Sequence, residues 1–209
     1  MPENPPVDRS GAPRVFGPHR RWSDLRPCLG LPEATLAALD RAVAFAVGRH
    51  GDQRRPAGEP YVEHLLETLD VLVHGPGVRD QDVLVAAILH DVVEDTATSD
   101  EEVREAFGAG VAGLVAWVTK PEAAGDAARL AYLGSLREAP DDAVLLKLAD
   151  RLSNVQRLDT HPRPGKRASY YAETVAHLLP LASRHPWYEA WYAAWRDRHA
   201  GLLDAGRGR

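Results

Sequence analysis

The segment 83–96, VLVAAILHDVVEDT, places ionisable side chains at the end of a strongly apolar stretch. Residues 83–89 are all apolar, which is typical of a buried helix. His90, Asp91, Glu94 and Asp95 follow within the next turns. Charged groups in apolar surroundings are costly unless they have partners. The fold must therefore bring other polar groups, or a ligand, to this helix.

The rest of the chain is patterned for helices. From Trp22 onward, apolar residues recur at helical spacing and no segment alternates as a strand does. Gly and Pro mark loops at 51–60 and 161–167, and Thr98/Ser99 before acidic residues is a helix-start signature. We expect helices within 31–50, 61–73, 80–96, 98–107, 126–138, 141–158, 168–185 and 186–206, with 108–120 helical or mixed. The pattern predicts an all-α bundle with short connections.

Length and composition limit the domain organisation and the partners. The 209 residues suit one domain, which we place at 21–205, after a flexible tail over the Pro- and Gly-rich residues 1–20. A formal net charge of −5 does not favour nucleic acid or an anionic membrane surface as a partner. No apolar run approaches membrane-spanning length. The single cysteine, Cys28, excludes an internal disulfide and fits a reducing cytoplasm.

Two other apolar helices carry side chains that could join the first group. His64 lies in YVEHLLE, and Asp150 follows the apolar approach of LLKLADRLSNV. Each residue taken alone is more typical of a satisfied core group or a local ion pair. Together, the order H…HD…D on three helices favours one shared site. Two imidazoles and two carboxylates suit a divalent metal with mixed N/O ligation and open positions for water and substrate.

This pattern resembles the HD-domain metal-dependent phosphohydrolases. The stretches 50–68, 85–120 and 145–158, with the motifs HDxxEDT and DRLxN, are similar to the hydrolase domain of the bifunctional alarmone synthetase/hydrolases over roughly residues 36–184. The resemblance implies an HD-domain helical bundle. Only a Trp-rich helix follows this region, so we expect a stand-alone small alarmone hydrolase. The family's reaction removes the 3′-pyrophosphate from guanosine 3′,5′-bis(diphosphate) or the pentaphosphate, giving GDP or GTP.

The resemblance also implies roles for individual residues. The family metal is manganese, and Glu94 and Asp95 would be the catalytic acids. Arg55 would stack on the base and Asn154 would contact substrate near the metal, with Lys147 and Arg151 as further candidate cations for the phosphates. The implied metal ligands are His64, His90, Asp91 and Asp150.

Several positions depart from the family pattern and leave the substrate open. Pro56 and Ala57 replace a basic residue and Ser, Ser153 stands where His or Tyr is frequent, and Arg157 stands where a small polar residue is common. The alternatives are another nucleotide substrate, such as the 2′-phosphate of NADPH, a 3′-phosphorylated nucleotide or an adenosine alarmone. A non-enzymatic nucleotide sensor is a further alternative, which loss of a ligand or of the acidic pair would favour.

A second regular feature lies near the C-terminus. Trp187, Trp191 and Trp195 recur every four residues and form one stripe on a helix. Such stripes are more often core or dimer packing than a ligand site. We therefore expect either burial in the domain or a surface through which a homo-oligomer forms.

Overall fold

The computed structural model describes residues 5–18, 21–121 and 125–202. In these ranges the chain contains helices and two isolated β-bridges but no β-strand, so the predicted all-α class is confirmed. The α-helices are α1 (Trp22–Leu25), α2 (Glu33–His50), α3 (Val62–His74), α4 (Gln81–Leu89), α5 (Val92–Asp95), α6 (Asp100–Phe107), α7 (Ala109–Val118), α8 (Asp126–Ser135), α9 (Asp141–Val155), α10 (Pro164–Glu173), α11 (Leu179–Ala182) and α12 (Pro186–His199). Shorter elements are the 3-10 turns η1 (Arg26–Cys28) and η2 (Leu158–Thr160) and the π-helical η3 (Thr174–Leu178).

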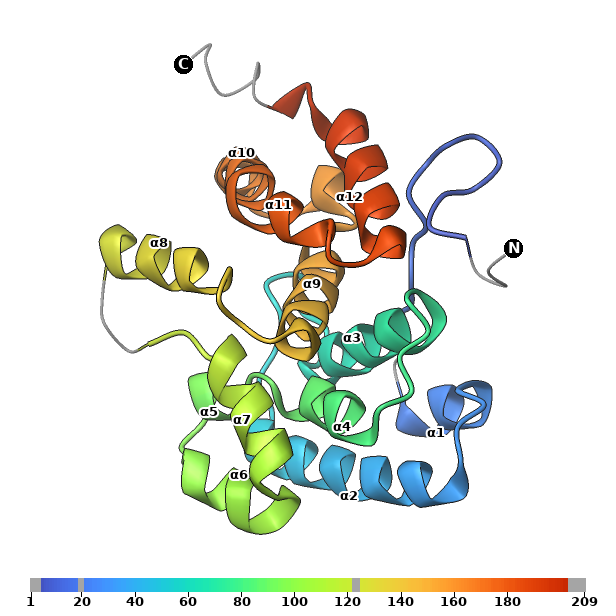
Figure 1. Cartoon of the computed structure of the whole chain (residues 1–209), viewed down its shortest axis with the longest axis vertical. Coiled ribbons are helices and arrows are strands. Elements are labelled where there is room, and N and C mark those ends of the chain that lie inside the picture. The colour runs from blue at the N-terminus through green and yellow to red at the C-terminus, as the bar shows by residue number, and fades with distance from the viewer. Residues whose placement is uncertain (1–4, 19–20, 122–124, 203–209) are drawn as a thin grey trace.

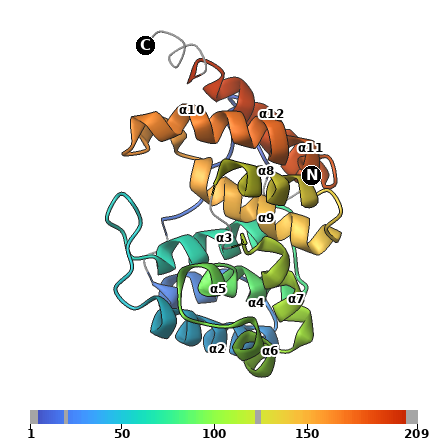
Figure 2. The same cartoon turned by 90° about the vertical axis from the view of Figure 1, so that its left-hand side faces the viewer.

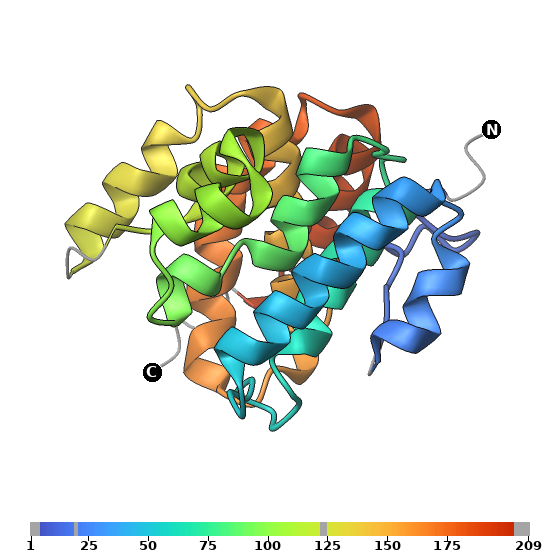
Figure 3. The ribbon, with the colours of Figure 1, turned by 90° about the horizontal axis from the view of Figure 1, so that it is seen from below.

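Helix α9 lies in the middle of the molecule (Figure 1). It packs on α3, α4 and α7 on one side and on α11 and η3 on the other. The side view shows α10 to α12 above α9 and α2 below α3 and α4 (Figure 2). Seen from below, α2 crosses this face beside α4 (Figure 3), and these two helices are in extensive contact. The three helices that carry the predicted metal ligands are thus adjacent in the core.

Most of helix α4 is buried. Its residues 83–89 are each 3% exposed or less, as the apolar run predicts. Asp80 caps its N-terminus, where its side chain accepts from the backbone N–H groups of Asp82 and Val83. This cap satisfies backbone donors that have no partner inside the helix. The burial fixes the orientation of α4 and hence the direction of the polar residues that follow it.

The predicted continuous helix over 80–96 is wrong, because the chain breaks between α4 and α5. Helix α4 ends at Leu89 and α5 starts at Val92. The His90 ring contacts the Ala87 carbonyl through Nδ1 at 2.8 Å. An unbroken α-helix would use that carbonyl for the N–H of residue 91. The ring therefore takes over a backbone acceptor at the point where the helix ends.

Other predicted boundaries shift by a few residues. The loop at 161–167 is shorter than predicted, since α10 starts at Pro164, a residue favoured in a first helical turn. The expected helices 126–138 and 141–158 end earlier, at Ser135 and Val155. The predicted cap before α6 is present as a capping box, in which Ser99 and Glu102 each accept from the other's backbone N–H.

The N-terminal segment differs from the flexible tail that its composition predicts. Phe16 is 2% exposed and packs edge-to-face against Trp187. Its N–H donates to Gln156 Oε1 at 2.7 Å, and the Arg14 carbonyl accepts from Trp191 Nε1 at 2.7 Å. These contacts dock residues 14–16 on the domain. Residues 1–4 and 19–20 of the predicted tail, and residues 203–205 of the predicted domain, lie outside the described residues.

The aromatic stripe of α12 is part of the core. Trp187 is 5% exposed, and Trp191 and Trp195 are fully buried. Because these indoles pack inside their own chain, self-association would have to use other surface.

None of the helices in the described ranges combines the length and the apolar character needed to cross a bilayer.

Candidate metal centre

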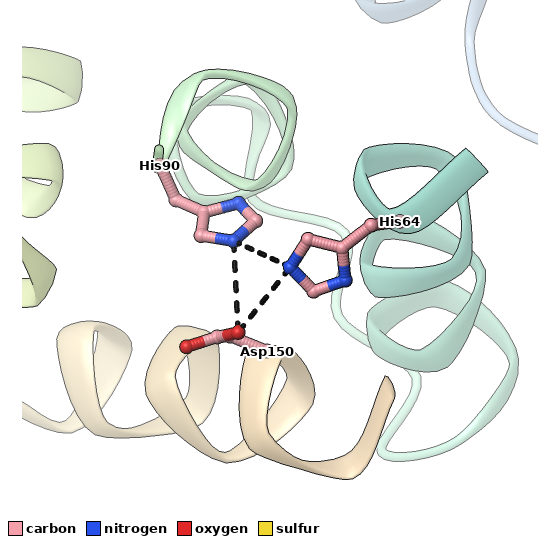
Figure 4. A group of neighbouring side chains, drawn as sticks. All are labelled: His64, His90 and Asp150. Carbon is pink, nitrogen blue, oxygen red and sulfur yellow. Dashed lines mark hydrogen bonds and ion pairs between the residues drawn. The ribbon is translucent and has the colours of Figure 1, made fainter. Parts of the chain in front are cut away.

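Three polar side chains from α3, the end of α4 and α9 meet inside the apolar core (Figure 4). His64, His90 and Asp150 are 2%, 1% and 7% exposed. The two Nε2 atoms lie 3.2 Å apart, and Asp150 Oδ1 is 3.4 Å from His64 Nε2 and 3.7 Å from His90 Nε2. Residues that are far apart in the sequence thus direct their donor atoms at one point.

Asp91 brings a fourth donor to the same place. Its Oδ2 lies 3.1 Å from His90 Nε2 and 3.4 Å from His64 Nε2. The hydroxyl of Tyr61 donates to this oxygen at 2.6 Å. Burial, and next the charge of Asp91, raise the pKa of Tyr61, so its hydroxyl keeps the proton that it donates. All four predicted ligands are therefore together.

The spacing of these donors suits a single small cation. Nitrogen and oxygen ligands bind divalent metals at about 2.0–2.2 Å, which separates neighbouring donors by about 3.0–3.6 Å. Five of the six separations among the four donors run from 3.1 to 3.7 Å. His64, His90 and Asp150 can therefore surround one ion without a large rearrangement, and Asp91 Oδ2 lies within 3.4 Å of both imidazoles.

The hydrogen bonds behind the imidazoles also fit a metal. His90 Nδ1–H donates to the Ala87 carbonyl, so Nε2 carries the lone pair when the ring is neutral. Ser153 Oγ donates to Glu67 Oε2 at 2.5 Å and can then only accept from His64 Nδ1–H, at 2.9 Å. Both lone pairs consequently face each other at Nε2, an arrangement that requires a shared proton or a cation between them.

The charges around the cluster support the same interpretation. Burial alone raises the pKa values of Asp91 and Asp150, but His90 next to Asp91 and Lys147 next to Asp150 hold both values well below the usual range. Burial alone lowers the pKa of His90, but Asp91 and Asp150 raise it to about 10. Two carboxylates thus create a negative potential that attracts a proton to His90. A divalent cation would satisfy the same potential.

Asp150 is held from two sides. Lys147 Nζ lies 2.9 Å from Asp150 Oδ2, and Asn154 Nδ2 donates to Asp150 Oδ1 at 2.7 Å. Lys147 is 3% exposed, also contacts the Val118 carbonyl and lies over the Tyr132 ring. These contacts engage the ammonium group that we expected to hold substrate phosphate. Its role toward substrate stays a prediction.

A pocket of about 250 Å³ opens beside the cluster and contains both predicted acids. Glu94 pairs with Lys120, at 2.6 Å from Nζ, and also accepts from the Lys120 backbone N–H. Asp95 is exposed and accepts from Gln53 Nε2 at 3.1 Å. Carboxylates and a flexible cation therefore line the pocket next to the candidate metal ligands.

Two arginines also line this pocket. Arg151 pairs with Glu173 Oε1 and lies over the Tyr170 ring, 5.6 Å from its centroid. Arg129 pairs with the other oxygen of Glu173 at 2.5 Å. One partly buried carboxylate thus holds two guanidinium groups. Paired guanidinium groups are well suited to bind a phosphate or diphosphate.

A second hollow of about 260 Å³ adjoins the first and shares Tyr61, Asn154 and Tyr170 with it. Arg55 lines this hollow and donates to Asn154 Oδ1 at 3.2 Å. The remaining lining residues include Arg54, Pro56, Ala57, Arg157, His161 and Pro162. Arg55 and Asn154 are therefore placed where the two hollows meet, which is compatible with the contacts predicted for them.

Several groups around the site were not identified from the sequence. Tyr61 precedes α3 and Lys120 follows α7, so neither stands out in an apolar run. Arg129 and Glu173 lie on amphipathic helices, where a charged residue is ordinary. Glu67 could have been identified from the sequence, because a carboxylate within the largely apolar segment HLLETLDVLV (64–73) requires a partner.

Comparisons with known proteins identify the family of this chain. A family model described as "HD domain" matches residues 42–187. The guanosine-3′,5′-bis(diphosphate) 3′-pyrophosphohydrolase of Aquifex aeolicus is 42% identical over 154 residues, which are 70% of this chain and 21% of that protein. The chain spans about a fifth to a quarter of the length of the first curated relatives that it matches.

Shorter relatives match over most of their length. The guanosine-3′,5′-bis(diphosphate) 3′-pyrophosphohydrolase MESH1 of Danio rerio is 38% identical over 70% of this chain and 84% of that protein. A solved structure described as a metazoan ortholog of SpoT that hydrolyzes ppGpp superposes with a TM-score of 0.71 and 31% identity, covering 80% of this chain and 97% of that one. The family model, the sequence matches and the shared fold agree. The chain therefore belongs to the HD domain family.

Proposed function

We propose that this chain is a metal-dependent hydrolase that converts guanosine 3′,5′-bis(diphosphate) to GDP and pyrophosphate, and the pentaphosphate to GTP. The observation that carries the proposal is the cluster of His64, His90, Asp91 and Asp150 beside a pocket lined by acids and cations. Two relatives, the long protein of Aquifex aeolicus and the short one of Danio rerio, are both named as hydrolases of this substrate. Manganese is the cation that we propose.

The four donors would hold the cation beside the pocket that Asp91 and Asp150 line. When bound, such a cation supplies Lewis acidity, which acidifies water and offsets charge on phosphoryl oxygens. Tyr61 keeps Asp91 in place by donating to Oδ2, and Asn154 does the same for Asp150 at Oδ1. The chain therefore provides a fixed set of ligands before substrate binds.

The cations and acids of the pocket would perform the remaining tasks. Arg129 and Arg151, fixed by Glu173, would bind the 3′-diphosphate, and Lys120 would stabilise charge that develops on it. In the reaction, an oxygen of water bonds to the phosphorus next to the sugar and the bond to the 3′-oxygen breaks. Glu94 and Asp95 are the groups that would take the proton from water and deliver one to the departing 3′-oxygen.

The adjoining hollow would hold the nucleoside. Arg55 is placed to stack on the base, and Arg54 and His161 line the same hollow, where a 5′-diphosphate would extend. Pro56 and Ala57 make this wall less polar than the family's usual loop. The identity of the base therefore has to be tested directly.

The test is turnover of guanosine 3′,5′-bis(diphosphate) by the full chain with Mn²⁺, with products separated by chromatography. We expect GDP and pyrophosphate, and loss of turnover when a chelator is added. NADPH, a 3′-phosphorylated nucleotide and an adenosine alarmone serve as competing substrates. Preferential turnover of one of these, with release of phosphate from the first two or pyrophosphate from the third, would replace the proposed substrate, and turnover of none would favour a nucleotide sensor.

A further inference from the structure

Behind the metal ligand His64 lies a buried polar group that the reaction itself does not use. Glu67 is 3% exposed and sits one turn after His64 on α3. Its Oε2 accepts from Ser153 Oγ at 2.5 Å, and the same hydroxyl is 2.9 Å from His64 Nδ1. A hydroxyl has only one proton, so donating it to Glu67 leaves Ser153 as an acceptor for His64.

Two arginines also contact the Glu67 carboxylate. Arg157 Nη1 lies 2.8 Å from Oε1, and Arg55 Nη1 lies 3.7 Å from Oε2. Arg157 is fixed in turn, because its Nη2 donates to the Phe16 carbonyl. A continuous hydrogen-bonded chain therefore runs from the N-terminal segment through Arg157, Glu67 and Ser153 to His64.

We propose that Glu67 is a positioning residue for the metal centre, which acts through Ser153 to fix the His64 tautomer that presents Nε2 as a ligand. The proposal rests on the proposed metal-dependent function. Carboxylates that orient a ligand histidine commonly change metal affinity 10- to 100-fold when they are removed. Here the carboxylate reaches the ring through a hydroxyl, and the docked residue Phe16 supports it.

The alternative is that the network serves only to satisfy buried polar groups. In that case its loss would lower stability but leave the metal affinity of the folded protein unchanged. The two roles therefore predict different results for metal binding, which is measured without any substrate.

The experiment is Mn²⁺ titration of the full chain by calorimetry, with circular dichroism to verify folding. Ser153→Ala removes the acceptor for His64 Nδ1–H. Glu67→Gln places an amide next to Arg157 and Ser153; the amide can donate to the Ser153 hydroxyl, which favours the His64 tautomer with the proton on Nε2. We expect each variant to bind Mn²⁺ about 10-fold or more weakly. Ser153→Thr keeps the hydroxyl and should bind within about threefold of the wild type.

Thr68→Ala is the matched control. Thr68 is fully buried and also contacts His64, but its hydroxyl donates to the backbone carbonyl rather than to the ring. This variant should lose stability and keep its Mn²⁺ affinity. If Ser153→Ala or Glu67→Gln behaved like Thr68→Ala, the positioning role would be overturned.

A second measurement separates this proposal from the proposed function. In metal-free protein labelled with ¹⁵N-histidine, His64 should show a protonated Nδ1 and an unprotonated Nε2, assigned by the signal that His64→Gln removes. Glu67→Gln should change this pattern. A wild-type His64 protonated at Nε2 would refute the positioning role even if Mn²⁺ binding and hydrolysis were both observed. Absent hydrolysis with the expected tautomer would count only against the proposed function.

Discussion

The two faces of α9 show how differently one helix can be used. One face carries Asp150 and Asn154 toward α3 and the end of α4, where each polar atom has a specific partner. The other is covered by aromatic residues of α12, and Tyr192 and Trp195 donate to the α9 carbonyls of Leu148 and Val155. We conclude that α12 stabilises α9 by burying its aromatic side chains against it. The opposite face of α9 carries the side chains of the candidate metal site.

This difference predicts that mutations on the two faces separate activity from stability. A side chain of the polar face contributes through charge and ligation, and much of its burial cost is already offset by its neighbours. A side chain of the aromatic face contributes through buried area. The predictions below test this separation.

The largest effect is expected for Asp91→Ala. The variant loses a ligand and leaves the Tyr61 hydroxyl without its acceptor. Turnover should fall by at least about 10⁴-fold, because water activation depends on the metal. Assays with saturating Mn²⁺ and a circular dichroism spectrum would check that activity, and not the fold, is lost. Full activity in this variant would remove Asp91 from the site.

On the aromatic face, Trp195→Ala should have the opposite profile. Trp195 is fully buried and contacts Trp191, Tyr192 and Tyr171. Its removal should cost about 3–5 kcal/mol in urea unfolding. The Mn²⁺ affinity of the protein that remains folded should stay within about threefold of the wild type, since distant sites are nearly additive. A large loss of affinity at unchanged stability would reverse the assignment of the two faces.

Glu94→Gln tests the pocket next to the ligands. The amide cannot accept or deliver the proton as a carboxylate does, so kcat should fall by roughly 100-fold or more. Metal binding should persist, since none of the four candidate ligands is changed. Parallel measurements of kcat and Mn²⁺ affinity check this. Unchanged turnover would exclude Glu94 from the chemistry.

The smallest effect concerns the metal-free protein at alkaline pH. The pKa of His90 is raised from 6.5 to about 10 in the folded chain. The contribution of the protonated His90 ring to folding stability is therefore complete below pH 6.5, and it is lost as the pH rises toward 10. We expect Tm in EDTA to fall by about 2–5 °C across this window.

Two controls isolate this titration. His90→Asn should show a flatter pH dependence, and Mn²⁺-loaded protein should not share the loss, because a coordinated imidazole carries no extra proton. A pH profile of the metal-free wild type that matches that of His90→Asn would contradict the assigned charge state.

The same contrast explains what could be predicted from the sequence. Isolated polar residues in apolar helices predicted that His64, His90, Asp91 and Asp150 lie close together, because buried polar groups require partners. The every-fourth spacing of the tryptophans predicted one stripe but not its partner. Whether such a stripe is covered by the same chain or by a second copy depends on packing that its own sequence does not contain.

Other features depend on contacts between distant residues. The break after Leu89 coincides with a contact between the His90 ring and the Ala87 carbonyl, which helical periodicity cannot reveal. The docking of Phe16 depends on Gln156 and Arg157, about 140 positions away. Local composition therefore suggested a free tail where long-range hydrogen bonds hold the chain.

The central claim is that His64, His90, Asp91 and Asp150 bind one divalent cation next to the acidic pocket. The most direct measurement is anomalous diffraction from crystals grown with Mn²⁺. We expect a single strong peak about 2.0–2.3 Å from a donor atom of each of these four residues. A Mn²⁺ bound elsewhere, or no peak together with side chains that point apart, would contradict the account.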